Sequence, residues 1–248
     1  MPIELNQARK VVIEDRGHIY TLTFGKITSQ MWLDYFARIT HLTEYQKGKS
    51  VTTFDSSGAR VALVESALVD ALGYNTGSEP LISVPEWQKK LPNSHRLAAG
   101  NVLTAVVLAE EESDDAPLSL GVEHVFLRAL WSANEDGSMV EVDGLVHRFT
   151  TPTAEQQRRY SRDSARSRVT SNSRSSKTEW LGAQATLMRL YDELIEEVRG
   201  YTVDGKEELP RDVIVANMDG YHKVAAAEAL FAPASTKTKI DDAAKEGE

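Results

Sequence analysis

The chain of 248 residues contains no cysteine. This absence excludes disulfide bridges, thiolate zinc sites and cysteine nucleophiles together. Long apolar runs are missing as well. No window reaches the roughly 18 consecutive apolar residues of a membrane span, and the N-terminal stretch MPIELNQARKVVIEDRG lacks the apolar segment of a signal peptide. We therefore expect a soluble, unsecreted protein that is made, or assembles, in the cytoplasm.

Sequence motifs typical of catalytic sites are also missing. The sequence contains no GxxxxGKS/T or GxGxxG phosphate loop, no GxSxG nucleophile turn and no HExxH zinc motif. Its histidines are scattered, at His18, His41, His95, His124, His147 and His222. The sequence thus predicts no catalytic residue, no metal site and no cofactor, and favours a binding or structural protein. The rival interpretation is an enzyme whose site assembles from scattered side chains in a pocket around His147 or His222.

Acidic residues outnumber basic ones along the whole chain, 37 against 28, which gives a formal net charge of −9. Such a protein is repelled by nucleic acid and by anionic membranes unless a local basic patch intervenes. One segment has the opposite character. Residues Arg158 to Lys177 hold six arginines and one lysine against a single acidic residue, Asp163, among many serines.

We interpret this arginine-rich segment as a docking arm for an acidic protein surface or for phosphates. The basic residues assigned to it are Arg158, Arg159, Arg162, Arg166, Arg168, Arg174 and Lys177. Two other interpretations stay open: a solvated helix end that runs into a mobile loop, or arginines that pair with acidic faces of the protein's own helices. Tyr160 is the only aromatic residue in the segment, so base stacking is not supported.

Several phrases of the sequence recur in the same order at a nearly constant distance. VALVESALVDALGY ends at Gly73-Tyr74 and LMRLYDELIEEVRGY ends at Gly200-Tyr201, while HRLAAGNVL is echoed by HKVAAAEALF, in both cases 127 residues later. Further matches upstream and between these blocks are Thr28 with Thr153, Tyr35 with Tyr160, Pro85 with Pro210, and Asp15 and Gly17 with Asp143 and Gly144. Because the blocks are colinear, a tandem duplication explains them better than chance similarity between Ala-rich helices.

Each half is expected to contain the same α+β unit. Alternating apolar residues around the two Asp/Gly turns predict a β-hairpin, and in the second half a further strand precedes it, turned at Asn134 to Gly137. A helix then starts at ITSQMW or at the capping box PTAEQ. A core-facing helix follows and runs to Gly73 or Gly200, and short proline-started and small-residue helices come last.

The predicted fold class is therefore α+β, a tandem duplication of a unit with a β-hairpin or meander followed by about three helices. Repeat 1 covers residues 1–112, an acidic linker covers 113–117, and repeat 2 covers 118–234 with the arginine-rich segment 158–177 inside it as a loop. Residues 235–248 form a polar tail without core residues, which we expect to be disordered.

The small-residue helix is predicted to be the surface on which each repeat packs, or on which the two repeats meet, because alanine allows another element to approach closely. The residues assigned to this packing are His95, Ala98, Ala99, His222, Ala225 and Ala226. The two histidines fall in the first turn, where an imidazole most often bonds a nearby carbonyl or cap. One histidine per repeat, without a carboxylate at fixed spacing, does not make a metal site.

The segment VEVDGLVHRFTTPTAEQQRRYSR resembles the opening of small phage tail assembly chaperones and related phage structural proteins, where a short hairpin runs into a helix that starts PT-x-x-E/Q. The resemblance implies a non-enzymatic bacteriophage protein of tail assembly or of the virion, present in the host cytoplasm during assembly. Its expected partners are other phage or assembly proteins, with a homo-oligomer as a further option. Nucleic acid ranks second as a partner, through the arginine-rich segment.

Overall fold

The computed structural model contains helices together with several small, mostly antiparallel sheets, which confirms the α+β class. It describes residues 2–39, 42–46, 49–53, 55–104, 107–110, 122–132, 138–164, 167–172, 175–180 and 183–231. The predicted acidic linker and the polar tail lie outside these residues. No helix in the described part of the chain is both long enough and apolar enough to cross a membrane.

The first half begins with a hairpin of β2 (Arg9–Asp15) and β3 (His18–Phe24), as predicted. Left-handed backbone at Arg16 and Gly17, with φ of 52° and 77°, makes the tight turn between the strands. β6 (Leu68–Leu72) adds to the other side of β3 and completes a three-stranded sheet. The helices of this half are α1 (Ser29–Arg38), α2 (Ser56–Ala67), α3 (Trp87–Lys90) and α4 (Asn93–Leu103).

Short elements connect β6 to α3 in this half. They are β7 (Asn75–Thr76), β8 (Glu79–Pro80) and the 3-10 turn η1 (Leu81–Ser83).

The second half repeats this order of elements around a larger sheet. β10 (Val122–Ser132) and β11 (Met139–Thr150) form the long central hairpin, with β14 (Ile195–Arg199) on one side and β9 (Val107–Glu110) on the other. The helices are α5 (Ala154–Ser164), α6 (Gln184–Leu194), α7 (Arg211–Asn217) and α8 (Gly220–Phe231). β9 belongs by number to the first predicted repeat, yet it pairs with the second half's sheet.

Two sequence predictions about the second half's hairpin differ in outcome. The further strand expected before the predicted hairpin exists as β10, while the turn expected at residues 134–137 lies outside the described residues. The turn expected at Asp143-Gly144 does not exist, because β11 runs through these residues without interruption. Gly144 has a φ of 68°, and the register of β10 against β11 shifts nearby, between Leu127 and Ala129. The glycine therefore marks an irregularity within a strand, whereas its counterpart Gly17 makes a true turn.

Both core-facing helices end earlier than the periodicity predicts. α2 ends at Ala67 and α6 at Leu194, and the chain passes directly into β6 and β14. In each strand a bulge adds one residue, Val69 or Glu196, to the pairing with β3 or β11. The bulge places inward side chains three residues apart, which is also the spacing of one helix face. The apolar pattern alone therefore could not distinguish the strand from a longer helix.

The predicted helix starts are confirmed at atomic detail. Thr28 caps α1, where its side chain accepts a hydrogen bond from the backbone N–H of Met31. Before α5 the capping box is reciprocal: the N–H of Thr153 donates to Gln156 Oε1 at 2.9 Å, and the N–H of Gln156 donates to Thr153 Oγ1 at 3.3 Å. Pro210 stands at the N-cap of α7, as expected for a proline-started helix.

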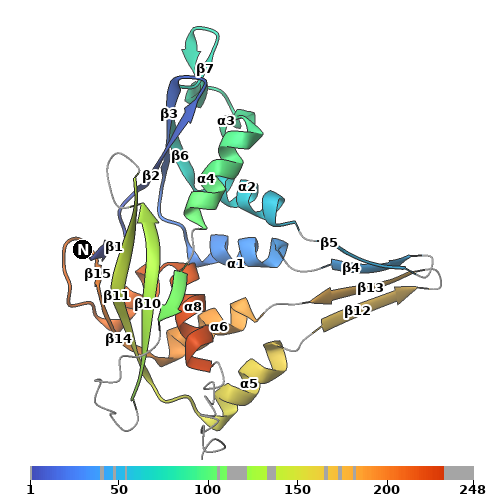
Figure 1. Ribbon diagram of the computed structural model, residues 1–248, viewed down its shortest axis with the longest axis vertical. Coiled ribbons are helices and arrows are strands. Elements are labelled where there is room, and N and C mark those ends of the chain that lie inside the picture. Colours follow the sequence, from blue (N-terminus) through green and yellow to red (C-terminus); the bar gives the residue numbers. More distant parts are fainter. Residues whose placement is uncertain are drawn as a thin grey trace, which may run out of the picture.

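The two halves share one core, and strands, hairpins and helices of one half also contact the other (Figure 1). β1 (Ile3–Glu4) from the N-terminal end pairs in parallel with β15 (Tyr201–Thr202). Each half also sends out a hairpin, β4 (Leu42–Gln46) with β5 (Lys49–Thr53), and β12 (Ser167–Asn172) with β13 (Ser175–Trp180). These hairpins join through β13 and β4 into one four-stranded sheet that extends away from the helices, to the right in Figure 1.

Helix α1 of the first half also packs against α8 of the second half. Trp32 is fully buried there, and its ring stands edge-on to Tyr221. Gly220 lies so close to Trp32 that a Cβ at this position would collide with the indole. Since only glycine leaves that room, the packing of α1 on α8 depends on this residue.

Several interactions occupy corresponding places in the two halves. Arg96 pairs with Glu65 in the first half, and Lys223 pairs with Asp192 in the second, 127 residues later in both positions. Gly73 and Gly200 both have left-handed backbone, with φ of 90° and 84°. These correspondences support the predicted duplication and the two-repeat division, both of which stay predictions until the halves are superposed.

Candidate functional site

The loop predicted over residues 158–177 is wrong for the described residues: they form the end of one helix and most of a hairpin, whose strands pair with each other. Arg158, Arg159 and Arg162 lie on α5, while Arg168 lies in β12 and Lys177 in β13. Arg166 and Arg174 lie outside the described residues. The segment therefore leads from the helical body of the second half into the projecting sheet, where β13 pairs with β4 of the first half.

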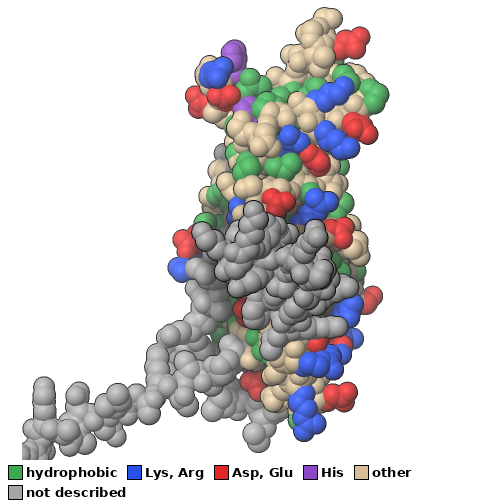
Figure 2. Space-filling view, turned by 90° about the vertical axis from the view of Figure 1, so that its right-hand side faces the viewer, with side chains coloured by type: hydrophobic (Ala, Val, Ile, Leu, Met, Phe, Trp, Pro, Cys, Tyr) green, Lys and Arg blue, Asp and Glu red, His purple; other side chains and the backbone are tan. Residues whose placement is uncertain are grey.

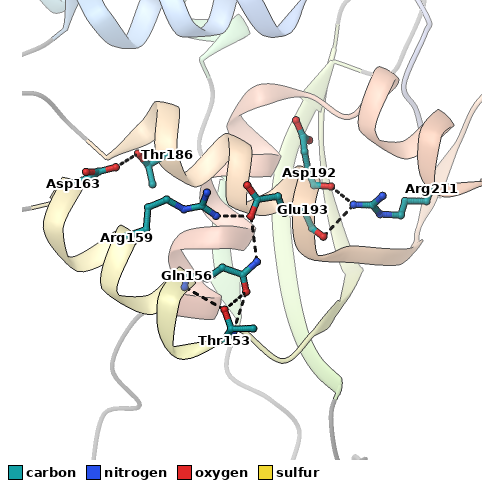
Figure 3. A network of polar contacts seen from close by, with 8 residues as sticks. All are labelled: Thr153, Gln156, Arg159, Asp163, Thr186, Asp192, Glu193 and Arg211. Carbon is teal, nitrogen blue, oxygen red and sulfur yellow. Dashed lines mark hydrogen bonds and ion pairs between the residues drawn. The ribbon is translucent and has the colours of Figure 1, made fainter.

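Two of the described arginines are held by acidic side chains of the same chain. Figure 3 shows the first of them, Arg159. Arg159 binds the Glu193 carboxylate of α6, which also accepts a hydrogen bond from Gln156 Nε2 at 3.2 Å. The hydrogen bond from Arg159 is the main cause that lowers the pKa of Glu193. Arg162 pairs with the adjacent Asp163 at 3.0 Å.

A second link joins the same two helices, since Thr186 of α6 donates to the Asp163 carboxylate at 2.7 Å. These contacts agree with the interpretation that arginines pair with the protein's own helices, at least for Arg159. On the face that is turned toward the projecting sheet, basic and acidic side chains lie interspersed over the described helices (Figure 2). A single large patch of positive charge is not seen on the described part of that face.

A series of hydrogen-bonded, buried polar groups in the second half was not predicted from the sequence. His147 is fully buried on β11, where its Nδ1 lies 3.0 Å from the hydroxyl of Tyr191 and its Nε2 lies 2.8 Å from that of Tyr201. The Tyr201 hydroxyl in turn lies 2.8 Å from Nδ1 of His222. One consistent assignment has Tyr191 donating to His147, His147 donating to Tyr201, and Tyr201 donating to His222, with both imidazoles neutral.

Burial keeps these groups uncharged. Desolvation lowers the pKa of His147 well below its usual value, and the nearby His222 lowers it further. Desolvation also lowers the pKa of His222, to about 4, although Asp219 acts in the opposite direction. The pKa values of Tyr191 and Tyr201 are raised, again chiefly by desolvation. At neutral pH the series is therefore a set of neutral hydrogen-bonding groups.

An ion pair lies beside His222, the last residue of this series of hydrogen-bonded groups. Arg9 of β2 binds Asp219 at 2.6 Å, and its guanidinium lies 3.6 Å from the ring centroid of Trp131. The cavity that Arg9, Asp219, Trp131 and His222 line has a volume of about 10 Å³, which is at most the room of a single water molecule. The arrangement therefore gives His147 and His222 buried hydrogen-bonding partners, and the cavity beside His222 has room for about one water molecule.

The small-residue helices bury most, but not all, of the residues predicted to pack. Ala99 and Ala226 are fully buried, Ala225 is half-buried and Ala98 is exposed, so Ala98 takes no part in this packing. His95 is buried, with its Nδ1 2.8 Å from the Tyr74 hydroxyl and its Nε2 3.3 Å from the Asp15 carboxylate.

The two helices meet different neighbours. α4 packs on α2 and β2 of its own half, whereas α8 packs on α6, β10 and β9 and also reaches α1. Of the two, it is α8 that joins the halves through the contacts described here.

The described residues contain no group of three or more His, Asp or Glu side chains that could hold a metal ion. Comparison of the chain with protein-family models, curated proteins and solved structures finds no match.

Proposed function

We propose that this protein is a non-enzymatic structural or assembly protein of the bacteriophage type, a tail assembly or virion component, that acts through contacts with other proteins. The observation that carries this proposal is the projecting four-stranded sheet, in the order β12-β13-β4-β5. In the described part of the chain no further strand pairs with β12 or β5, so both outer strands present an open edge. Open strand edges are templates for strands of another chain.

The contacts of the two buried histidines support the same proposal. His147 and His222 are the residues around which the rival enzyme site would form, and tyrosine hydroxyls and Asp219 surround them inside the core. Their hydrogen bonds account for their burial without any reaction. The resemblance of the segment VEVDGLVHRFTTPTAEQQRRYSR to phage proteins is the reason why we propose a bacteriophage particle. The protein would then be present in the host cytoplasm during assembly.

Replacing residues 42–53 and 167–180 by short Gly-Ser turns tests this proposal, because the replacement removes the projecting sheet and leaves the helical body. We expect the tagged full chain to retain protein partners from its host or from an assembling particle at 0.5 M salt, and the shortened variant to lose them. The melting temperature of both proteins serves as the control for folding.

Salt separates the alternatives, because phosphate contacts lose affinity steeply as salt rises. Retention of nucleic acid alone, lost at high salt, would favour the nucleic-acid alternative carried by the arginine-rich segment. Equal retention of protein partners by the full and shortened chains would overturn the role given to the sheet.

A further inference from the structure

A groove runs along one edge of the second half's sheet. Its volume is about 880 Å³, and its lining includes the end of β14, Gly200 and Tyr201 on one side and the segment from Glu207 to Pro210 on the other. That segment leads from β15 to α7 and is orange in Figure 1. Pro2, next to β1, lies at one border of the groove.

The groove is acidic. Asp143, Glu197, Glu207 and Glu208 line it against a single basic residue, Arg199. Arg199 is already engaged by Glu197, at 2.9 Å, and this hydrogen bond is the main cause that lowers the pKa of Glu197. Asp143, Glu207 and Glu208 are exposed, and none of the ion pairs of the described residues uses them. The groove therefore offers a negative potential that the protein itself does not neutralise.

An edge strand, β14, contributes Glu197, Val198 and Arg199 to the lining of the groove. β14 is the outermost strand in the order β14-β11-β10-β9, and no described strand covers its other side. Both ends of that side are occupied: the carbonyl of Ile195 accepts from Arg211 Nε at 2.9 Å, and the carbonyl of Gly200 accepts from the N–H of Ile3 at 2.8 Å. Between these two contacts lies a stretch long enough for about three or four residues of an added strand, at about 3.3 Å per residue.

The N-terminal strand shows that this edge accepts an extended segment. β1 adds in parallel beside β15, which continues from β14, with Ile3 opposite Tyr201 and almost completely buried. Glu4 fixes the addition, since its carboxylate accepts hydrogen bonds from Thr202 Oγ1 and from the N–H groups of Asp204 and Gly205, all at 3.0 Å.

We propose that the edge of β14 in this groove binds an extended, basic peptide segment of a partner protein, which adds as a further strand. Main-chain hydrogen bonds to the strand edge give the affinity, and alternate Lys or Arg side chains of the peptide face the carboxylates of the groove. This inference rests on the proposed function, since it names the chemistry of one partner contact, and it concerns a surface separate from the projecting sheet.

Synthetic peptides provide a direct probe for the full chain. The test peptide is acetyl-KVRV-amide with a fluorescent label, whose four residues match the open stretch of β14. The second peptide replaces the basic residues by glutamate, and the third carries N-methyl groups at alternate residues, which remove half of its backbone donors. We expect saturable binding of the first peptide in fluorescence anisotropy, and binding at least tenfold weaker for the other two.

The matched protein variants carry the same change of charge at different places. Glu207→Gln with Glu208→Gln lowers the charge of the groove, and Glu14→Gln with Glu79→Gln lowers it at exposed positions in the first half. We expect the groove variant to weaken binding of the basic peptide about tenfold and the control variant to leave it unchanged. Melting temperatures of both variants establish that they are folded.

Each outcome decides the proposal. Equal binding of the N-methylated peptide would reduce the groove to a non-specific acidic surface, and absence of binding up to millimolar concentration would overturn the proposal outright. If the protein self-associates and the groove variant abolishes this in sedimentation velocity, the occupant is a second copy and the partner proposed here is wrong. A partner retained by the projecting sheet would leave the proposed function standing in every one of these cases.

Discussion

The two halves place the same Tyr-His pair in different surroundings. In the first half Tyr74 bonds His95, whose other nitrogen reaches the exposed Asp15. In the second half Tyr201 bonds His222 in the same way and also bonds His147, which binds Tyr191. At the positions 125 and 127 residues before His147 and Tyr191 the first half carries Leu22 and Val64, both buried.

The buried polar pair His147 and Tyr191 of the second half thus corresponds to an apolar pair in the first half. The difference shows that the polar series is not required by the architecture, because the first half forms the same elements without it. Buried hydrogen-bonded groups do restrict a core to one arrangement, since each misplacement leaves an unsatisfied group. This restriction applies to the core of the second half. The segments β1 and β9 and the side chain of Arg9, all from the rest of the chain, contact that half.

The outer faces of the two sheets differ as well. In the first half Ile19, Val69 and Leu72 are 69%, 61% and 58% exposed on the sheet of β2, β3 and β6. The positions of Val69 and Leu72 correspond to Glu196 and Arg199 of the second half, where Arg148 pairs with Glu196 at 3.3 Å and Glu197 at 3.0 Å. Charge therefore covers one sheet and apolar side chains are left on the other.

The largest expected effect of the polar groups in the second half is on the pH dependence of stability. Because the folded-state pKa values of His147 and His222 lie below about 6.5, the unfolded chain binds protons that the folded chain does not. The free energy of unfolding should fall as pH falls from about 6.5 toward 4, by about 1.4 kcal/mol per pH unit for each histidine. Urea unfolding at pH 7, 6, 5 and 4.5 measures this slope.

The variant His147→Leu with Tyr191→Phe, which brings the second half closer to the first, should lose one histidine's share of the slope. An unchanged slope in this variant would show that His147 does not titrate on unfolding.

Removing the shared hydroxyl should have the next largest effect. Tyr201→Phe deprives both His147 and His222 of a partner, so we expect a loss of about 2–6 kcal/mol of stability, since each unsatisfied buried group costs about 1–3 kcal/mol. Tyr74→Phe in the first half deprives only His95, and about 1–2 kcal/mol is expected. Equal losses, measured by urea unfolding at pH 7, would contradict the asymmetry between the halves.

The two corresponding ion pairs should differ by a smaller amount. Lys223 is fully buried and donates to both Asp192 and the carbonyl of Val215, each at 2.7 Å. Desolvation raises the pKa of Asp192, and the hydrogen bond from Lys223 opposes that rise. Lys223→Met should therefore cost about 2–3 kcal/mol, because it leaves polar groups unpaired.

Arg96→Met is the matched change in the first half, where the Arg96 side chain is partly exposed. It should cost about 1 kcal/mol or less, since water can solvate Glu65. A larger loss for Arg96→Met than for Lys223→Met would reverse the comparison.

The smallest effect is expected from the arginine-rich segment. Replacing Arg162, Arg166, Arg168 and Arg174 by serine should change the free energy of unfolding by less than about 0.5 kcal/mol, as surface changes usually do. Incorporation into particles, or partner binding, should fall if the segment is a docking arm. Unchanged assembly would leave it a solvated segment, and a loss well above 1 kcal/mol would mean that these arginines hold the protein's own helices, as Arg159 holds Glu193.

Local sequence signals predicted several helix starts correctly. Thr28, Thr153 with Gln156, and Pro210 marked helix starts correctly because capping depends on residues within one turn. The helix ends at Ala67 and Leu194 could not be read in the same way. There the spacing of the apolar residues fits a helix face and a bulged strand equally, and only pairing with β3 or β11 decides between them.

The sequence by itself determined the α+β class, the order of elements that recurs in the two halves, and the Tyr-His spacing of 21 residues that recurs in them. Each of these depends on neighbours close along the chain. The tertiary structure decided that His147 lies between two tyrosines, that Arg9 pairs with Asp219, 210 residues away, and that β1 adds to β15. Partners so far apart along the chain are chosen by packing and by the cost of leaving a buried polar group unpaired, and no local pattern records that choice.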